Sequence, residues 1–387
     1  MNKKFIPPFD LKFNSSDKDW ILNRFKEILD TGFVSASKNV KDFEQKIRDF
    51  FNVKYALASS SGTSALEMIF RAIDVRNHTV VMPSMTFMAT PTAAIHAGAK
   101  VIFTDCEKEN MQIDFNDLQR KIRKDTKAVV VVHMSGMITP HIEKIRKLCD
   151  ERKIFLIEDA AHAHGAQFKE KLAGTFGDAS AFSFFSTKVL TMGEGGAVIT
   201  NNEEIYNKCL MLRDHGRPGI APNIHTELGY NWRASEFNAV VGIRQMEKAW
   251  EIIKKRQYLA KVYDSEINSV GIEDVIPLII PEHIKSAYYK YVLFLKPPLK
   301  REELKKLLRE KYGVCLSGEV YHKACHDQPV WKKYPECVIR TEEENFSNTE
   351  FVCNTHFCPP LYPSLTEEDV KYVVKSLKKA IRELKDD

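Results

Sequence analysis

Short apolar runs alternate with amphipathic stretches over the first two thirds of the chain. The apolar runs are residues 79–83, 99–105, 127–134 and 153–160. They are apolar along their whole length and rich in β-branched side chains, which is typical of strands that are buried on both faces. The amphipathic stretches predict helices over residues 86–98, 114–126 and 138–152. This alternation predicts an α/β fold in which helices cover a mainly parallel sheet.

The pattern changes beyond residues 238–267, whose spacing predicts one long amphipathic helix. Residues 288–296 are strand-like, and helical patterns cover residues 301–313 and 366–384. The last of these patterns begins at Thr366 and has Asp369 three positions later, which resembles the sequence of a capping box. The change predicts two domains, a large one of residues 10–248 and a smaller C-terminal α+β domain of residues 249–387.

Composition narrows the class of protein. The 387 residues are 44% hydrophobic and 28% charged, an ordinary balance for a soluble chain with a packed core. The net charge of +5 would suit an anionic small molecule, but no dense Lys/Arg block lies among aromatic residues, which argues against nucleic acid. No apolar run approaches the ~20 residues of a membrane span, and the first residues lack the apolar core of a signal peptide.

The eight cysteines stand singly, with no C-x-x-C pair among them. Such usage is typical of a reduced, cytoplasmic protein and not of a disulfide framework. His322, Cys325 and His326 have the residue types of metal ligands, but no second cluster completes a site, so no metal is expected.

Lys188 stands between an apolar run and a glycine-rich turn, in SFFSTKVLTMGEGG (183–196). Residues 181–185 predict a strand, and small residues after the lysine leave room beside it. Most lysines are simply solvated. A lysine at the end of a buried strand, however, lies where parallel sheets gather their functional groups. Lys188 is therefore a candidate reactive amine.

A carboxylate and an anion site accompany this amine. Asp159 lies at the end of the apolar run 153–160, where burying a carboxylate is costly unless a cation lies close to it. The alternative role of Asp159 is a helix N-cap. Residues 58–70 place Ser-Gly-Thr-Ser before a helical pattern, and the free N–H groups at a helix start can bind phosphate. A plain capping turn is the alternative there. Ser183 could add a hydroxyl to the same anion.

Phe87 and His162 add planar groups to this set. An amine, a buried carboxylate, an anion cradle and planar side chains are what a lysine Schiff base with pyridoxal 5′-phosphate requires. The carboxylate keeps the pyridine nitrogen protonated through a bond worth about 1.5–3 kcal/mol. The amine must lose its proton, so its ordinary pKa of about 10.4 has to be lowered by burial or bypassed by imine formation.

Several stretches in a fixed order resemble the DegT/DnrJ/EryC1/StrS family of sugar aminotransferases. They are SSSGTSAL, MPSMTFMATPTAAIHAGAKVIFTDCE, IEDAAHAHGA, GTFGDASAFSFFSTKVLTMGEGGAVITN, LRDHG and LGYNWRASEFNAVVGIRQME. The resemblance is continuous over about residues 10–250. It is looser through SAYYKYVLF, residues 321–326 and CPPLYPSLTEEDV. It implies a type I aminotransferase fold, pyridoxal 5′-phosphate and a homodimer with shared active sites.

The resemblance also implies roles for single residues. Lys188 is similar to the family's Schiff-base lysine and proton carrier, and Asp159 to the carboxylate that pairs with the pyridine nitrogen. His162 and Phe87 resemble the groups that pack on the two faces of the ring. The residues similar to phosphate ligands are Gly62, Thr63, Ser64 and Ser183, with Asn231 donated by the partner subunit.

The implied reaction transfers an amino group from glutamate to a nucleotide-linked keto-sugar. Candidate substrate-binding residues are Arg213, His215, Arg217, Arg233, Tyr321, His322 and His326. Ser135 stands where many members have a bulky ring, and Val189 where they have Asn; the C-terminal Tyr-x-Pro-Leu-His run is also changed. The first and third of these departures leave the sugar open, whereas the cofactor chemistry should tolerate Val189.

Other functions stay open at this point. A keto-cyclitol, or a phosphorylated or acidic keto-sugar without nucleotide, is an alternative acceptor. A sugar 3-dehydratase would have histidine at position 188, so the lysine argues against it. A non-catalytic cofactor-binding regulator would be expected to lose Lys188 or Asp159, and both are present.

Overall fold

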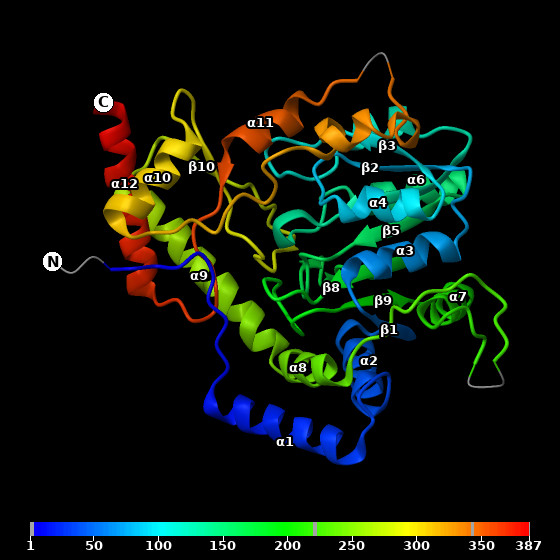
Figure 1. The fold of residues 1–387 in the computed structure, drawn as a ribbon. Helices are drawn as coiled ribbons and strands as arrows, with labels where there is room; N and C mark the ends of the chain where they lie inside the picture. The colour runs from blue at the N-terminus through cyan, green and yellow to red at the C-terminus, as the bar shows by residue number, and fades with distance from the viewer. Residues whose placement is uncertain (1–3, 220–222, 342–343, 387) are drawn as a thin grey trace.

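The computed structural model describes residues 4–219, 223–341 and 344–386, and a seven-stranded sheet forms its centre (Figure 1). In spatial order the strands are β1 (Tyr55–Ser59), β9 (Gly196–Thr200), β8 (Ala179–Ser183), β5 (Phe155–Asp159), β4 (Thr126–Val132), β2 (Thr79–Pro83) and β3 (Lys100–Thr104). The five strands from β8 to β3 run parallel, whereas β9 is antiparallel to both of its neighbours. The predicted mainly parallel α/β sheet is confirmed.

Helices cover both faces of this sheet (Figure 1). One apolar cluster joins the sheet to α2 (Lys38–Phe51), α5 (Phe115–Lys121), α6 (Ile142–Arg152) and α8 (Glu236–Glu247). A second cluster joins it to α3 (Gly62–Ala72), α4 (Ala89–His96) and α7 (Glu203–Arg213). Asp114 accepts the N–H groups of Asn116 and Asp117 and so caps α5 as predicted. Strands such as β4 are therefore buried along almost their whole length between the two clusters.

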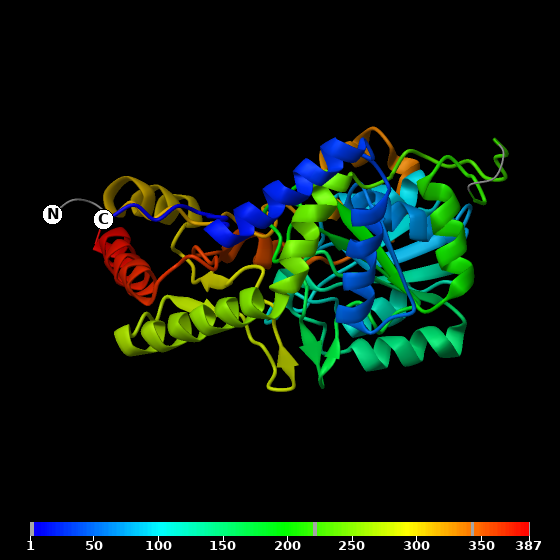
Figure 2. The same cartoon turned by 90° about the horizontal axis from the view of Figure 1, so that it is seen from below.

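The long helix predicted over residues 238–267 is wrong, because two helices stand there. They are α8 and α9 (Ala249–Val270), which meet at Lys248 (φ −102°, ψ 9°). The Lys248 ammonium group bonds Asp17 of α1 (Ser15–Thr31) at 2.6 Å. Figure 2 shows α1 lying across α8, whereas α9 packs against the C-terminal helix α12 (Glu367–Asp386). Two different packing partners account for the break.

The C-terminal part has its own small sheet and core. Its three antiparallel strands are β10 (Val275–Pro277), β12 (Leu293–Leu295) and β13 (His356–Phe357). Helices α9, α10 (Arg301–Tyr312) and α12 enclose an apolar cluster that includes Tyr263, Leu304 and Leu377. The predicted capping box is present, since the Thr366 N–H group donates to Asp369 at 2.9 Å and the Asp369 N–H group to Thr366 at 3.1 Å.

The strand predicted over residues 288–296 is reduced to β12. Residues before it bond instead to the turn after β4: the Ala287 N–H group donates to the Gly136 carbonyl at 2.8 Å, and the Lys290 N–H group to the Ser135 carbonyl at 3.3 Å. Three short strands form a separate small sheet, β6 (Gln167–Phe168), β7 (Lys171–Leu172) and β11 (Ile284–Lys285). None of the helices in the described ranges combines the length and apolar character that crossing a membrane requires.

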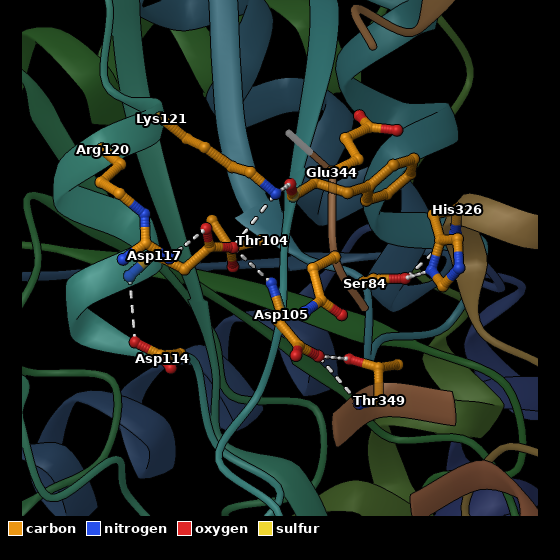
Figure 3. Close-up of polar contacts among 12 residues, drawn as sticks. Ser84, Thr104, Asp105, Asp114, Asp117, Arg120, Lys121, His326, Glu344 and Thr349 are labelled. Atoms are coloured by element: carbon orange, nitrogen blue, oxygen red, sulfur yellow. Dashed lines mark hydrogen bonds and ion pairs between the residues drawn. The ribbon is translucent and has the colours of Figure 1, made fainter. Parts of the chain in front are cut away.

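A buried carboxylate joins the two parts of the chain (Figure 3). Asp105, just after β3, accepts the Thr349 N–H group at 2.8 Å and its hydroxyl at 2.6 Å. It also accepts the Asn348 N–H group at 3.2 Å, so a residue from the sheet edge caps α11 (Ser347–Thr355). The N–H group of Asp105 itself donates to Asp117 at 2.7 Å. The first turn of α11 is therefore satisfied from a distant part of the sequence.

Asp105→Ala is expected to lower the free energy of unfolding by about 1–3 kcal/mol, because it leaves buried N–H groups of α11 without acceptors. Urea unfolding followed by circular dichroism measures this. Asp19→Ala, an exposed aspartate on α1, is the control and should change stability by less than about 0.5 kcal/mol. Equal stability of the two variants would contradict the capping role.

Candidate active site

A cavity of about 530 Å³ opens where the carboxyl ends of β5 and β8 meet the C-terminal part. This volume lies within the range of small-molecule sites, roughly 300–1,000 Å³. Side chains from both parts line it, among them Lys188, Asp159, Tyr289 and Tyr321. The cavity therefore lies at the position expected of ligand sites in parallel α/β sheets.

Lys188 lies in the turn after β8, where its N–H group donates to the Phe185 carbonyl at 2.9 Å. Its ammonium group is 4.9 Å from the ring centroid of Tyr289. Burial lowers the pKa of Lys188 to about 8; Asp159 acts in the opposite direction and Lys290 in the same one. An amine with such a pKa is partly neutral near physiological pH.

Asp159 ends β5 and is buried. One carboxylate oxygen accepts the Thr90 hydroxyl at 2.7 Å, and the other accepts the Ala161 N–H group at 3.2 Å. Turns follow it up to β6, so no helix begins there and the N-cap alternative is wrong. The two bonds fix the carboxylate in the cavity wall.

Another carboxylate, Glu158, sets the position of β8 relative to β5. Glu158 is fully buried and accepts His133 Nε2 at 2.7 Å. It also accepts the N–H groups of Gly174, Phe176 and Gly177 at 2.6–2.7 Å. Burial alone would raise the pKa of Glu158, but the His133 and backbone bonds lower it overall. The sequence pattern did not predict a separate role for Glu158, because Glu158 directly precedes Asp159 at the end of the same predicted strand.

The start of α3 forms one end of the cavity. Ser61 and Ser64 form a capping box, in which each side chain accepts the backbone N–H group of the other residue. Ser64 does not line the cavity, so the capping-turn alternative holds for this residue. Gly62, Thr63 and Ser183 do line it. A Cβ atom on Gly62 would lie 2.8 Å from that of Ser183. Only glycine lets the first N–H groups of α3 approach Ser183 so closely.

Aromatic side chains form the side walls. The His162 ring stacks on Tyr289 with centroids 4.2 Å apart, and its Nε2 lies 3.4 Å from the Tyr321 hydroxyl. Burial, with the nearby cations Lys188 and Lys290, lowers the pKa of His162 well below its usual value. Phe87 is 60% exposed at the cavity wall and stacks on Tyr321 at 5.9 Å. The slot between these rings is suited to a flat ligand.

Most predicted substrate-binding residues lie outside this cavity; only Tyr321 lines it. Arg213 pairs with Glu44 at 2.7 Å and also bonds the Ala58 carbonyl. Arg217 and Arg233 both pair with Asp214.

The remaining predicted residues are also elsewhere. His215 and Asn231 are exposed on the loop after α7, of which residues 220–222 lie outside the described part. His326 bonds Ser84 at 2.7 Å (Figure 3) and lines a separate cavity of about 260 Å³. His322 bonds Arg301 at 2.7 Å. Ser135 is buried behind the wall.

The sequence missed several wall residues, including Tyr289, Lys290, Thr187 and Glu319. For Tyr289 and Lys290 the sequence signal was weak, because SAYYKYVLF resembles the family only loosely and its pattern predicts a strand. Tyr289 contacts the Lys188 turn through Thr187, with the two hydroxyls 3.4 Å apart.

The wall residues fit pyridoxal 5′-phosphate. Lys188 offers an amine, Asp159 a fixed carboxylate, and the first turn of α3 with Ser183 a phosphate cradle kept open by Gly62. His162 lines the same cavity, and its Nδ1 is buried without a hydrogen-bond partner among the described residues. Within the same ranges, no group of three or more His, Cys, Asp or Glu side chains could hold a metal ion.

Known proteins resemble the chain along nearly its whole length. A model of the DegT/DnrJ/EryC1/StrS aminotransferase family matches residues 15–378. GDP-perosamine synthase of Escherichia coli O157:H7 is 31% identical over 97% of this chain and 98% of its own. UDP-4-amino-4,6-dideoxy-N-acetyl-β-L-altrosamine transaminase of Campylobacter jejuni (strain NCTC 11168) is 31% identical over 96% of each chain.

Among solved structures, PseC of Helicobacter pylori, an aminotransferase of pseudoaminic acid biosynthesis, is similar with a TM-score of 0.87 and 25% identity. The match covers 98% of this chain and 100% of PseC. The predicted fold class is thereby confirmed.

Lys188 is expected to react with amine reagents through a pH midpoint near 8 in cofactor-free protein, because burial lowers its pKa and only the neutral amine reacts. Reductive methylation at pH 6–11, with peptide mass spectrometry, measures the labelled fraction. Lys285, which is exposed on β11, is the control lysine. Coincident pH profiles for the two lysines would contradict the shift.

Proposed function

The chain belongs to the DegT/DnrJ/EryC1/StrS aminotransferase family, and from this membership we propose that it transfers an amino group from glutamate to a nucleotide-linked keto-sugar. It is an aminotransferase, and the cofactor of its family is pyridoxal 5′-phosphate. The sugar and the donor are parts of the proposal.

One observation carries the assignment of the site: Lys188 and Asp159 line the same cavity. They come from neighbouring parallel strands, since Asp159 is in register with Ala181 of β8. When bound there, pyridoxal 5′-phosphate supplies an electron sink for the carbon that gains or loses the amino group. Asp159 would accept the bond from the protonated pyridine nitrogen.

Lys188 has two tasks in this proposal. Its amine attaches the cofactor, and once free it carries the proton between the two carbons of the transfer. A pKa of about 8 suits both tasks, because an efficient acid–base group titrates near the working pH. The Lys188 turn bonds to Phe185 and contacts Tyr289, which holds the amine inside the cavity.

The remaining residues would bind and orient. Gly62, Thr63 and Ser183 line the phosphate end, and Ser64 supports it through the cap of α3. His162 and Phe87 would enclose the flat ring from its two sides. Tyr321, which contacts both, would border the sugar.

We propose a homodimer with shared sites. Asn231 is exposed and does not line the cavity of its own chain, so its predicted phosphate contact requires a partner subunit. Apolar side chains exposed around α1, Leu22, Leu29 and Phe33, offer a surface for that partner. The exposed loop with His215 and Arg233 would reach the partner's substrate. Arg213 and His326 are engaged with Glu44 and Ser84 and would support structure instead.

Two features support the substrate class and the compartment. The two curated relatives are named for GDP- and UDP-linked amino sugars, which favours a nucleotide-linked acceptor without fixing the base. All eight cysteines are unpaired, which suits the cytoplasm.

Lys188→Ala is expected to reduce amine transfer at least about a thousandfold, because the variant has no amine to attach the cofactor or carry the proton. Mass spectrometry with glutamate and a panel of keto-sugars, with and without nucleotide, measures transfer. In the unsubstituted protein, glutamate should shift the visible absorbance of the bound cofactor. Lys285→Ala is the control. Transfer to free keto-sugars alone would show that the acceptor is not nucleotide-linked. Full activity of Lys188→Ala would contradict the assignment of the active site.

Mixing Lys188→Ala with Asn231→Ala subunits is expected to restore roughly a quarter of the wild-type activity. Random exchange gives half heterodimers, each with one site that has both residues intact. The activity of each variant alone and of the exchanged mixture tests this. A mixture no more active than its parents would contradict shared sites.

A further inference from the structure

The cavity wall holds a second ammonium group, that of Lys290. Its Nζ donates to the Ser317 carbonyl at 2.7 Å and lies 5.4 Å from the ring centroid of Tyr289. Lys188 Nζ lies 4.9 Å from the same centroid. Both ammonium groups therefore lie close to the same aromatic ring, and both lysines line the same cavity.

Lys290 has no carboxylate as an ion-pair partner within the described residues. The nearby wall carboxylate, Glu319, pairs instead with Lys305 at 2.9 Å and with Arg301 at 3.3 Å. Burial lowers the pKa of Lys290, and the buried guanidinium group of Arg256 adds to this. A half-buried ammonium group that bonds only a carbonyl is incompletely satisfied. Such a group in a cavity is suited to an anion from outside the protein.

The position of Lys290 is fixed by its backbone. Its N–H group donates to the Ser135 carbonyl, and the Ala287 N–H group and Ser286 hydroxyl both donate to the Gly136 carbonyl, at 2.8 and 3.0 Å. A Cβ atom on Gly136 would lie 2.8 Å from the Tyr289 nitrogen. Only glycine permits this approach, so the segment is held against the turn after β4 before any ligand arrives.

We propose that Lys290 binds the carboxylate attached to the reacting carbon of the amino donor, and so makes the enzyme specific for α-amino acids. The inference rests on the proposed function. In an α-amino acid that carboxylate is two bonds from the transferred nitrogen, so it must lie close to Lys188. In a nucleotide-linked sugar the diphosphate is separated from the keto carbon by part of the sugar ring. The shorter separation matches a cation that shares a ring with Lys188.

The variants are Lys290→Met, which removes the charge at similar length, Lys290→Arg, which keeps it, and Lys285→Met, an exposed lysine on the same segment. The donor half-reaction is followed by cofactor absorbance without sugar, using glutamate and 4-aminobutanoate, which lacks the α-carboxylate. Lys290→Met should lower kcat/KM for glutamate at least tenfold, mainly through KM, and leave that for 4-aminobutanoate unchanged. Lys290→Arg should recover part of the loss, and Lys285→Met should match the wild type.

Calorimetric titration with 2-oxoglutarate gives a readout without turnover, and Lys290→Met should weaken binding by the same factor. Lys290→Gln replaces Lys290→Met if the latter does not fold. Equal losses for glutamate and 4-aminobutanoate, no loss, or a rise confined to the KM of the sugar would overturn the inference while leaving the proposed function intact. A wild-type protein that accepts no amino donor would overturn both.

Discussion

The carboxylate of Glu158 holds together the two strands on which the site depends. It is inaccessible to water and accepts hydrogen bonds from His133 and from three backbone N–H groups in the segment before β8. A buried carboxylate is stable only when its lone pairs are satisfied, so this set of donors admits one arrangement of the loop. That loop leads directly into β8 and then to Lys188. The placement of Lys188 relative to Asp159 thus depends on a neighbouring residue that does not line the cavity.

The cavity wall brings together two lysines, Lys188 and Lys290, and the carboxylates Asp159, Glu194 and Glu319. Lys188 and Lys290 lie around Tyr289, and Arg256 is buried behind it with only carbonyl partners. Each positive charge disfavours protonation of the others, and burial acts in the same direction. Asp159 is the carboxylate that opposes this effect at Lys188. A site of this kind keeps the amine of Lys188 partly neutral near physiological pH.

The sequence predicted the sheet well, because strands buried on both faces leave a continuous apolar signal, as in β4 and β5. It also indicated Lys188 and Asp159, since polar residues at the ends of such strands stand out. It could not predict the break at Lys248, whose ammonium group bonds Asp17, 231 residues away. Nor could it predict that Arg213 is bound to Glu44, or that Lys290 enters the cavity. Those facts depend on long-range pairing, which local pattern does not encode.

The cap on α11 has a consequence for how the chain is made. Asp105 and Thr349 are 244 positions apart, so the donors that Asp105 receives from α11 are synthesised long after it. At 5–20 residues per second, synthesis takes about 12 to 50 s to cover that interval. During this time the Asp105 carboxylate is without the N–H and hydroxyl donors of α11. The end of β3 therefore acquires its full set of hydrogen bonds only after α11 has been made.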